Sequence, residues 1–424
     1  MRRTRNQGST IAMPVFCGGF LCSCIEMLRT ALTGFACMLG ACVPAQAQAT
    51  NCNQAAPQAI TQIDVPGHPF AAVPSADGCT VFVSLTARNG RSQIAVLARA
   101  DGTLSVARTL NVPGQLTGLA LSHDGRILVA ANGQGAALIS VQRLLAGADN
   151  AVLGVLNDGE GAGSIYAAFS PDDRLLYISN ERSSSLSLYD FAAMLAGKPT
   201  QMLGQIRTGG APVGLAFSPD GRWLYSTSEV APGERTCSAE GRGAAHPPGM
   251  LMVIDVERSA SDLEHAVVTR IAAGCNPVRV AVSPRGDRVY VTARGSNAML
   301  VFDAGKLISD HDHALSTTVP VGSSPVGIAA NEAQVFVANS DRFGGGRHQT
   351  ISVLDALRLG AAAASIPAGG FPRELRITQD GKSLLVTNFE SDSVELIDLA
   401  RLGELGIAAE STAGNEKWLS HRSS

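Results

Sequence analysis

The sequence predicts an all-β fold, a seven-bladed β-propeller of four-stranded blades, from a repeat, its strands and its two ends. The most regular copy, residues 209–227 (GGAPVGLAFSPDGRWLYST), joins two apolar strands through a Ser-Pro-Asp-Gly reversal. Proline presets φ at the first turn position there, and Asp-Gly tolerates the conformations that follow. Seven turns anchor the repeat: Asp77-Gly78, Asp124-Gly125, Asp172-Asp173, Asp220-Gly221, Arg285-Gly286-Asp287, a degenerate Asn331-Glu332-Ala333, and Asp380-Gly381.

Successive turns are about 47 or 48 residues apart, except for the step from Gly221 to Gly286, which contains an insertion of roughly eighteen residues. Each turn lies between two apolar strands, and a third and a fourth follow, as in residues 250–256 and 268–273. Four short strands in a period of this length are typical of a β-propeller. A two-helix solenoid has a similar period, but helices do not tolerate Val- and Ile-rich units with Pro-Asp-Gly turns.

The two ends of the repeat predict how the ring closes. The last unit stops after its third strand, at residues 393–399, and an orphan strand, residues 59–65, precedes the first complete unit. The orphan strand therefore completes the seventh blade, which also covers edge strands that would invite aggregation. We assign residues 50–58 to a linker, 59–402 to the propeller and 403–424 to a tail without repeat signal.

Residues 1–49 have the composition of an export signal. A basic opening leads through an apolar, Cys-rich run to residues 45–49 (AQAQA), which offer Ala-x-Ala cleavage sites. Met27 is an alternative start, and Cys42 in Leu-Gly-Ala-Cys makes a lipid-anchored protein the competing interpretation. The apolar run after Arg29 is shorter than the ~20 residues of a membrane span. We expect a periplasmic or extracellular protein whose mature chain has no transmembrane span.

Four of the nine cysteines remain after the leader, and an even number in an exported chain favours disulfides. The insertion, residues 230–249, should overhang the start of the fifth blade, so we predict a bond between Cys237 and Cys275. Cys52 and Cys79 lie beside the closing strand, on the opposite face, and we predict that they pair there.

Composition and motifs exclude several function classes. A formal net charge of −3 in 424 residues gives no electrostatic reason to expect nucleic acid. The mature chain has no Gly-x-Ser-x-Gly, His-Glu-x-x-His or Cys-x-x-Cys-His, which argues against an ordinary serine hydrolase, a zincin and a c-type cytochrome. Residues 309–313 (SDHDH) contain side chains that can bind a metal ion. Adjacent side chains on a strand point to opposite sides, so only pairs of them could converge on one ion, and we interpret the segment as a solvated loop. We predict no resident metal or cofactor, with calcium left open.

Several segments resemble the YVTN-repeat and lactonase-like seven-bladed propellers: residues 210–221, 289–292 (VYVT), 323–329 (SSPVGIA) and 371–373 (FPR) through Asn388. The likeness covers about residues 59–400. It implies the fold but only weakly a function, because one propeller hosts many chemistries. Members of this group include sugar-lactone hydrolases, surface-layer proteins and relatives of the propeller domains of periplasmic redox enzymes.

The predicted site lies on the rim where innermost strands start and second strands end, because ligands favour the mouths of such rings. Candidate catalytic residues there are His68, Glu181 and Glu229, and candidate ligand-binding residues are Tyr166, Asn180, Arg279, Arg294, Asn339, Arg373 and Asn388. The asparagines have an alternative role, in which they cap loops through hydrogen bonds to the backbone. The alternative for the two glutamates is that they are solvated loop carboxylates.

Arg279 and Arg373 are assigned to positions where other units carry Val213 and Val326, so a charge there breaks the repeat. Anion binding is one interpretation, and an inter-blade ion pair with Glu374 is the other. Residues 341–348 form a glycine-rich rim loop without the strand-to-helix context of a phosphate loop.

These features predict an exported monomer whose rim binds a small polar ligand or an envelope protein, without catalysis of its own. The alternative is a lactonase-like hydrolase, in which His68 or a rim glutamate activates water and the two arginines hold a carboxylate or oxyanion. An envelope scaffold without a small-molecule pocket is the third possibility.

Overall fold

The computed structural model describes residues 52, 54–86, 91–198, 201–233, 237, 246–342, 345, 349–360, 362 and 364–406. The chain divides into two units, Met1–Ala49 and Thr50–Ser424. The export signal, the Met27 start and the lipid anchor at Cys42 fall in the first unit, which lies outside the described residues. The second unit is the propeller.

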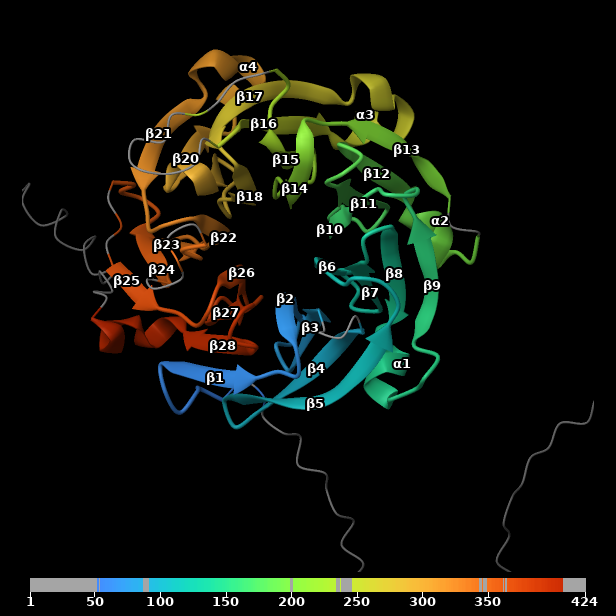
Figure 1. Ribbon diagram of the computed structural model, residues 1–424, viewed down its shortest axis with the longest axis vertical. Helices are drawn as coiled ribbons and strands as arrows, with labels where there is room; N and C mark the ends of the chain where they lie inside the picture. The colour runs from blue at the N-terminus through green and yellow to red at the C-terminus, as the bar shows by residue number, and fades with distance from the viewer. Residues whose placement is uncertain are drawn as a thin grey trace, which may run out of the picture. The chain divides into compact units, whose positions relative to one another are not determined.

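Seven four-stranded antiparallel sheets are arranged in a ring, as the repeat predicts (Figure 1). Within each blade the strands follow one another from the innermost to the outermost. Blade 1 holds β2 (His68–Pro74), β3 (Thr80–Thr86), β4 (Ser92–Ala100) and β5 (Thr103–Val112); blade 2, β6 (Leu119–Leu121), β7 (Ile127–Ala131), β8 (Gly135–Ser140) and β9 (Val152–Asn157); blade 3, β10 (Ser164–Phe169), β11 (Leu175–Asn180), β12 (Ser185–Asp190) and β13 (Met202–Arg207); blade 4, β14 (Gly210–Phe217), β15 (Trp223–Val230), β16 (Pro248–Asp255) and β17 (Val267–Cys275). Blade 5 holds β18 (Pro277–Val282), β19 (Arg288–Ala293), β20 (Ala298–Asp303) and β21 (Leu315–Pro320); blade 6, β22 (Pro325–Ala330), β23 (Gln334–Asn339), β24 (Thr350–Asp355) and β25 (Ala364–Pro367); blade 7, β26 (Pro372–Ile377), β27 (Ser383–Asn388), β28 (Ser393–Asp398) and β1 (Ile60–Asp64).

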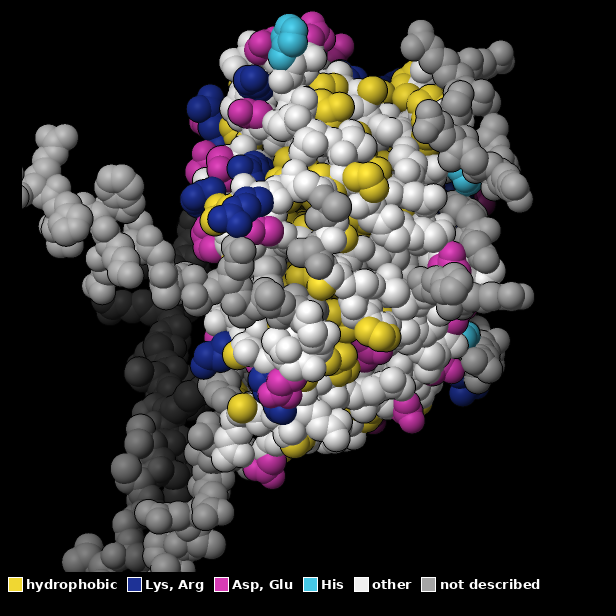
Figure 2. All heavy atoms as spheres, turned by 90° about the vertical axis from the view of Figure 1, so that its left-hand side faces the viewer, with side chains coloured by type: hydrophobic (Ala, Val, Ile, Leu, Met, Phe, Trp, Pro, Cys, Tyr) yellow, Lys and Arg dark blue, Asp and Glu magenta, His cyan; other side chains and the backbone are white. Residues whose placement is uncertain are grey.

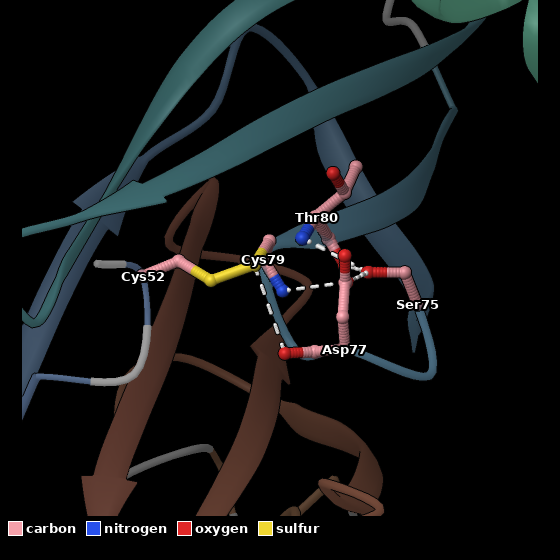
Figure 3. The surroundings of a disulfide bond; sticks show 5 residues. All are labelled: Cys52, Ser75, Asp77, Cys79 and Thr80. Atoms are coloured by element: carbon pink, nitrogen blue, oxygen red, sulfur yellow. Dashed lines mark hydrogen bonds between the residues drawn. A yellow bond between two sulfur atoms is a disulfide. The ribbon is translucent and has the colours of Figure 1, made fainter. Parts of the chain in front are cut away.

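The N-terminal strand closes the ring, which confirms the prediction from the orphan strand. β1 pairs antiparallel with β28, from Ile60 opposite Ile397 to Asp64 opposite Ser393. The predicted disulfide between Cys52 and Cys79 is present beside this closure (Figure 3). In the same turn Asp77 accepts hydrogen bonds from Ser75 Oγ and from the Cys79 amide.

Short helices interrupt the blades, and they were not predicted from the sequence. α1 (Val141–Ala146), α2 (Phe191–Leu195), α3 (Val256–Ser261) and α4 (Lys306–Ser309) follow the third strands of blades 2 to 5, and 3₁₀ turns occur at Leu263–His265, Arg294–Ser296, His311–His313 and Leu399–Leu405. The side chains of Ser140, Asp190 and Asp255 cap the first three helices. Such caps satisfy amides that a helix start leaves unpaired.

Hydroxyl groups at one level of the second strands join neighbouring blades. Thr227 Oγ1 accepts a hydrogen bond from the Gly214 amide of its own blade (2.9 Å) and donates to the Val278 carbonyl of the next (2.8 Å). Thr292 makes the equivalent bonds to the Arg279 amide and the Val326 carbonyl. Between the sheets, the second strands pack fully buried aromatic side chains at another shared position: Phe82, Tyr177, Tyr225, Tyr290 and Phe336.

Figure 2 shows one side of the molecule. Many of its Lys, Arg, Asp and Glu side chains gather towards the left edge of the view, and few lie in the middle.

Candidate functional site

A cavity of about 280 Å³ occupies the predicted rim at the mouth of the central channel, and we call it the rim cavity. Its apolar wall comes from equivalent positions of four blades, just after the start of each innermost strand. The residues that line the cavity are Ile165, Glu181, Val213, Glu229, Val278, Arg294, Val326, Arg342, Phe371 and Arg373. Four predicted site residues, Glu181, Glu229, Arg294 and Arg373, are thus brought together.

Glu181, Glu229 and Arg294 occupy equivalent positions at the ends of the second strands of blades 3, 4 and 5: Glu181 and Arg294 directly follow β11 and β19, and Glu229 is the penultimate residue of β15. The repeat itself therefore places them side by side. Arg294 Nη2 lies 2.7 Å from Glu229 Oε2, and both side chains are largely buried. Burial is the main cause that lowers the pKa of Arg294, and the carboxylate of Glu229 acts against it.

The guanidinium group of Arg373 packs against three aromatic rings. Its guanidinium carbon is 3.7 Å from the ring centroid of Phe70 and 5.5 Å from those of Phe371 and Phe389. Nε is buried, and no described residue gives this guanidinium a hydrogen bond or an ion pair. Burial, followed by the like charge of Arg279, lowers the pKa of Arg373 to about 9. The side chain is therefore still a cation at neutral pH, held by cation–π contacts instead of a carboxylate.

Glu181 is a half-buried carboxylate at the cavity wall. Its side chain makes no hydrogen bond or ion pair with a described residue. Burial raises its pKa, and the negative charge of Glu229 raises it further. A carboxylate in such surroundings holds and releases protons closer to neutrality than an exposed one.

The assignment of Arg279 to the position of Val213 is wrong by one residue. The Arg279 amide bonds Thr292 Oγ1 as the Gly214 amide bonds Thr227 Oγ1, so Arg279 is equivalent to Gly214, one step deeper in the channel. It is 4% exposed, does not line the rim cavity, and its Nε lies 3.2 Å from Glu374 Oε2. The inter-blade ion pair that the sequence offered as the alternative is therefore present.

Tyr166, Arg279 and Glu374 meet at this deeper level and close the channel; we call them the channel plug. Tyr166 Oη donates to Glu374 Oε1 at 2.6 Å, and Arg279 stacks 4.7 Å from the tyrosine ring. Arg376 Nη2 donates to Tyr166 Oη at 2.6 Å. Burial, the largest influence, raises the pKa of Tyr166. The sequence placed this tyrosine on the rim, but the structure places its hydroxyl inside the channel.

Glycine in the intervening blades makes room for the plug. Gly118, Gly214 and Gly327 occupy the same level in blades 2, 4 and 6, whereas the plug residues come from blades 3, 5 and 7. A Cβ on Gly118 would lie 2.5 Å from Tyr166 Cδ2, and one on Gly214 would lie 2.8 Å from Thr227 Oγ1. Large and absent side chains therefore alternate from blade 2 to blade 7, and blade 1 has the small Ala71 at this level.

The three candidate asparagines point into the blades. The amide nitrogens of Asn180, Asn339 and Asn388 donate to third-strand side chains, at 2.8 to 2.9 Å for Ser187, Ser352 and Glu395. All three asparagines are fully buried, and none lines the rim cavity.

His68 lies at the start of β2, away from the rim-cavity lining. Its ring stacks on Phe389 at 4.9 Å, and Nδ1 is 2.7 Å from Asp392 Oδ1. Neither Asp392 nor Phe389 was predicted from the sequence. Arg342 was also missed as a cavity residue, although the loop that carries it was noted; a cation beside the rim glycines was the available signal.

The second predicted disulfide, Cys237–Cys275, is also present. It fixes the insertion to the end of β17, where the Cys237 amide also donates to the His246 carbonyl at 2.8 Å. Residues 234–236 and 238–245 of the insertion, and 343, 344 and 346–348 of the rim loop, lie outside the described residues.

A second hollow of about 890 Å³ adjoins the rim cavity and shares Ile165 and Glu181 with it. Its lining includes the amide side chains of Gln115, Asn132, Gln134 and Asn157. A ligand in the rim cavity could therefore extend along neutral hydrogen-bonding groups.

Within the described ranges, no group of three or more His, Cys, Asp or Glu side chains is placed to hold a metal ion. His313 of the SDHDH segment pairs with Asp310 at 2.9 Å. The part of the chain that the structure describes contains no helix long and apolar enough to cross a membrane.

Comparison with protein families adds one match to this geometry. Residues 250–418 match the family model described as lactonase, 7-bladed beta-propeller. The lactonase-like resemblance is thus supported from the third strand of blade 4 onward. Comparison with curated protein sequences finds no significant match.

Solved structures share the fold. A chain of Kuenenia stuttgartiensis hydrazine synthase is 17% identical, with a TM-score of 0.62 over 80% of this chain and 97% of that chain. A chain of a mitotic checkpoint complex is 15% identical, with a TM-score of 0.61 over 80% and 93%. At these identities the likeness concerns the fold alone.

Proposed function

We propose that the protein binds a small carboxylate ligand in the rim cavity, with Arg373 as its anchor. The observation that carries this proposal is a cavity-lining arginine without a carboxylate partner among the described residues. Three arginines and two glutamates line the cavity, and one of the glutamates, Glu229, already forms an ion pair with Arg294. A ligand carboxylate would supply the acceptor that Arg373 lacks, and charge-assisted bonds of this kind are strong and directional.

Calorimetry at low ionic strength tests the proposal. The mature chain is titrated with gluconate, succinate and glutarate, and the best ligand is repeated with Arg373→Ala. We expect at least tenfold weaker binding, because a hydrogen bond to a charged group contributes about 1.5–3 kcal/mol. Arg126→Ala, in an exposed turn, is the matched control and should bind as the wild type does. Absence of binding for all three carboxylates, or equal affinity of the Arg373→Ala variant, would refute the site.

A second candidate function is hydrolysis of a lactone, which the family match and the environment of Glu181 favour. Glu181 would take a proton from water while the hydroxide adds to the lactone carbonyl near Arg373. The ring C–O bond would then break, and the alkoxide would take the proton back, which leaves a hydroxy acid. Turnover of a lactone panel, with and without Ca²⁺, should fall at least a hundredfold in Glu181→Gln. If the wild type turns over no lactone, the hydrolase proposal is refuted, and the carboxylate-binding proposal is unaffected.

We further propose that the protein is an exported monomer, periplasmic or extracellular, whose rim serves a small ligand or an envelope protein. Two disulfides support an oxidising compartment. Mass spectrometry of the native N-terminus separates cleavage near residue 49 from a lipid on Cys42. Sedimentation of the mature chain measures the oligomeric state.

A further inference from the structure

The channel plug separates the rim cavity from a second cavity at the other mouth, which we call the lower bowl. Its volume is about 420 Å³, and it shares no lining residue with the rim cavity. The innermost strands of all seven blades contribute to it. The plug residues Tyr166, Arg279 and Glu374 form part of its lining.

The lower bowl exists because small side chains recur at one level of the repeat. The position two residues beyond the plug is alanine in five blades: Ala120, Ala168, Ala216, Ala281 and Ala329. Blade 1 has Val73 there, and blade 7 has Arg376. A row of alanines leaves space that larger side chains would fill, so the wall of the bowl at this level is apolar except at Arg376.

The charges at the base of the bowl are unbalanced. Two arginines, Arg279 and Arg376, line it against one carboxylate, Glu374, among the described lining residues. His123, which also lines the bowl, has its Nδ1 2.7 Å from Asp173 Oδ1. Glu374 lies 3.2 Å from Arg279 Nε and 3.5 Å from Arg376 Nη2, so one carboxylate serves both guanidinium groups.

Several donors at this base have no acceptor among the described residues. These are Nη1 and Nη2 of Arg279 and Nε of Arg376, all of them buried. Arg279 as a whole is 4% exposed, whereas the Arg376 side chain is 40% exposed. A buried donor without a partner costs about 1–3 kcal/mol. The described residues at the base of the bowl therefore hold more positive charge and more hydrogen-bond donors than their one carboxylate can satisfy, and Arg376 is the group that a ligand can reach.

We propose that the lower bowl is a second binding site, for a small monocarboxylic acid with a compact apolar body. The carboxylate binds Arg376, the nearby charge of Arg279 strengthens the attraction, and the apolar body packs against the alanines. One surplus positive charge suits a monoanion, and apolar walls disfavour a polyhydroxylated ligand. The site lies on the opposite side of the plug from the rim cavity and does not depend on the function proposed there.

Titration of the full mature chain with 4-fluorobenzoate, followed by ¹⁹F NMR at low ionic strength, tests this proposal. Arg376→Ala installs the residue of the five other blades, and we expect at least tenfold weaker binding. Ala281→Leu keeps the arginine but fills the bowl, and we expect binding to be lost. Arg126→Ala, in an exposed turn outside both cavities, should leave the affinity unchanged, and 4-fluorobenzyl alcohol should bind at least tenfold more weakly than the acid.

Far-UV circular dichroism and melting verify that each variant folds. If Arg376→Ala does not fold, because Tyr166 loses a hydrogen-bond donor, Ala281→Leu still decides the location of binding. The proposal is overturned if the wild type does not bind 4-fluorobenzoate. It is equally overturned if binding persists in Ala281→Leu, or if Arg373→Ala alone abolishes it.

Discussion

Glu374→Gln should destabilise the protein strongly, because it removes the only carboxylate of the channel plug while keeping the side-chain shape. The Arg279 and Glu374 side chains are each 5% exposed and lie 3.2 Å apart. Removing one partner of a buried pair leaves an uncompensated charge, and the typical loss is about 3–5 kcal/mol. The contact of Glu374 with Arg376 adds little, because the Arg376 side chain is 40% exposed and its charge is screened by water.

Urea unfolding of the oxidised mature chain measures this loss, with fluorescence and circular dichroism as two probes of one transition. Glu404→Gln is the matched control, since Glu404 Oε2 pairs with Arg401 Nη2 on the surface at 2.8 Å and water screens their attraction, so the change should leave the stability close to that of the wild type. The double variant Arg279→Met, Glu374→Leu should be more stable than Glu374→Gln, because it removes both charges. A Glu374→Gln variant as stable as Glu404→Gln would show that the plug does not hold the ring together.

Three other perturbations test the scaffold. Thr227→Val keeps the side-chain shape but leaves the Gly214 amide and the Val278 carbonyl without their hydrogen bonds to the hydroxyl. Urea unfolding should show a loss of about 1–3 kcal/mol in the free energy of unfolding. An unchanged midpoint would contradict the inter-blade role of Thr227. Burial raises the pKa of Asp158 above 3.8, so the folded state binds the carboxyl proton more tightly than the unfolded state does. The free energy of unfolding should therefore fall as the pH rises above about 4. Asp158→Asn should flatten that fall, which urea unfolding between pH 4 and 7 measures. Replacing Cys237 and Cys275 by serine opens a bond across 38 residues and should lower the free energy of unfolding by about 3–4 kcal/mol, whereas equal melting of oxidised wild type and variant would refute this.

Much of the fold could be predicted because its signals are local and repeated. The Asp-Gly turns fixed the strand order, and Gly221 indeed has the left-handed φ of 72° that such a turn uses. The orphan strand fixed closure, and both disulfides followed from which face each loop occupies. The one-turn helices after the third strands could not be predicted in this way, since their few residues show no helical period.

The site was predicted less completely, because side-chain direction depends on register and on neighbours in other blades. The rim location of Glu181, Glu229 and Arg294 followed from equivalent positions at the ends of second strands. Asn180 follows the same logic, yet its amide turns into the blade to meet Ser187. The lower bowl escaped notice because alanine in a strand carries no chemical signal until seven strands converge.

A single step in register explains why the two channel arginines differ. The first pair of strands in blades 5 and 7 has a register shift, between Pro277 and Val280 and between Pro372 and Glu374. Consecutive residues there line the channel at successive depths, the first in the rim cavity and the second in the plug. Blade 5 places valine first and Arg279 second, where Glu374 neutralises it. Blade 7 places Arg373 first, where aromatic rings surround it and no described carboxylate pairs with it, so its charge is available to a ligand in the rim cavity.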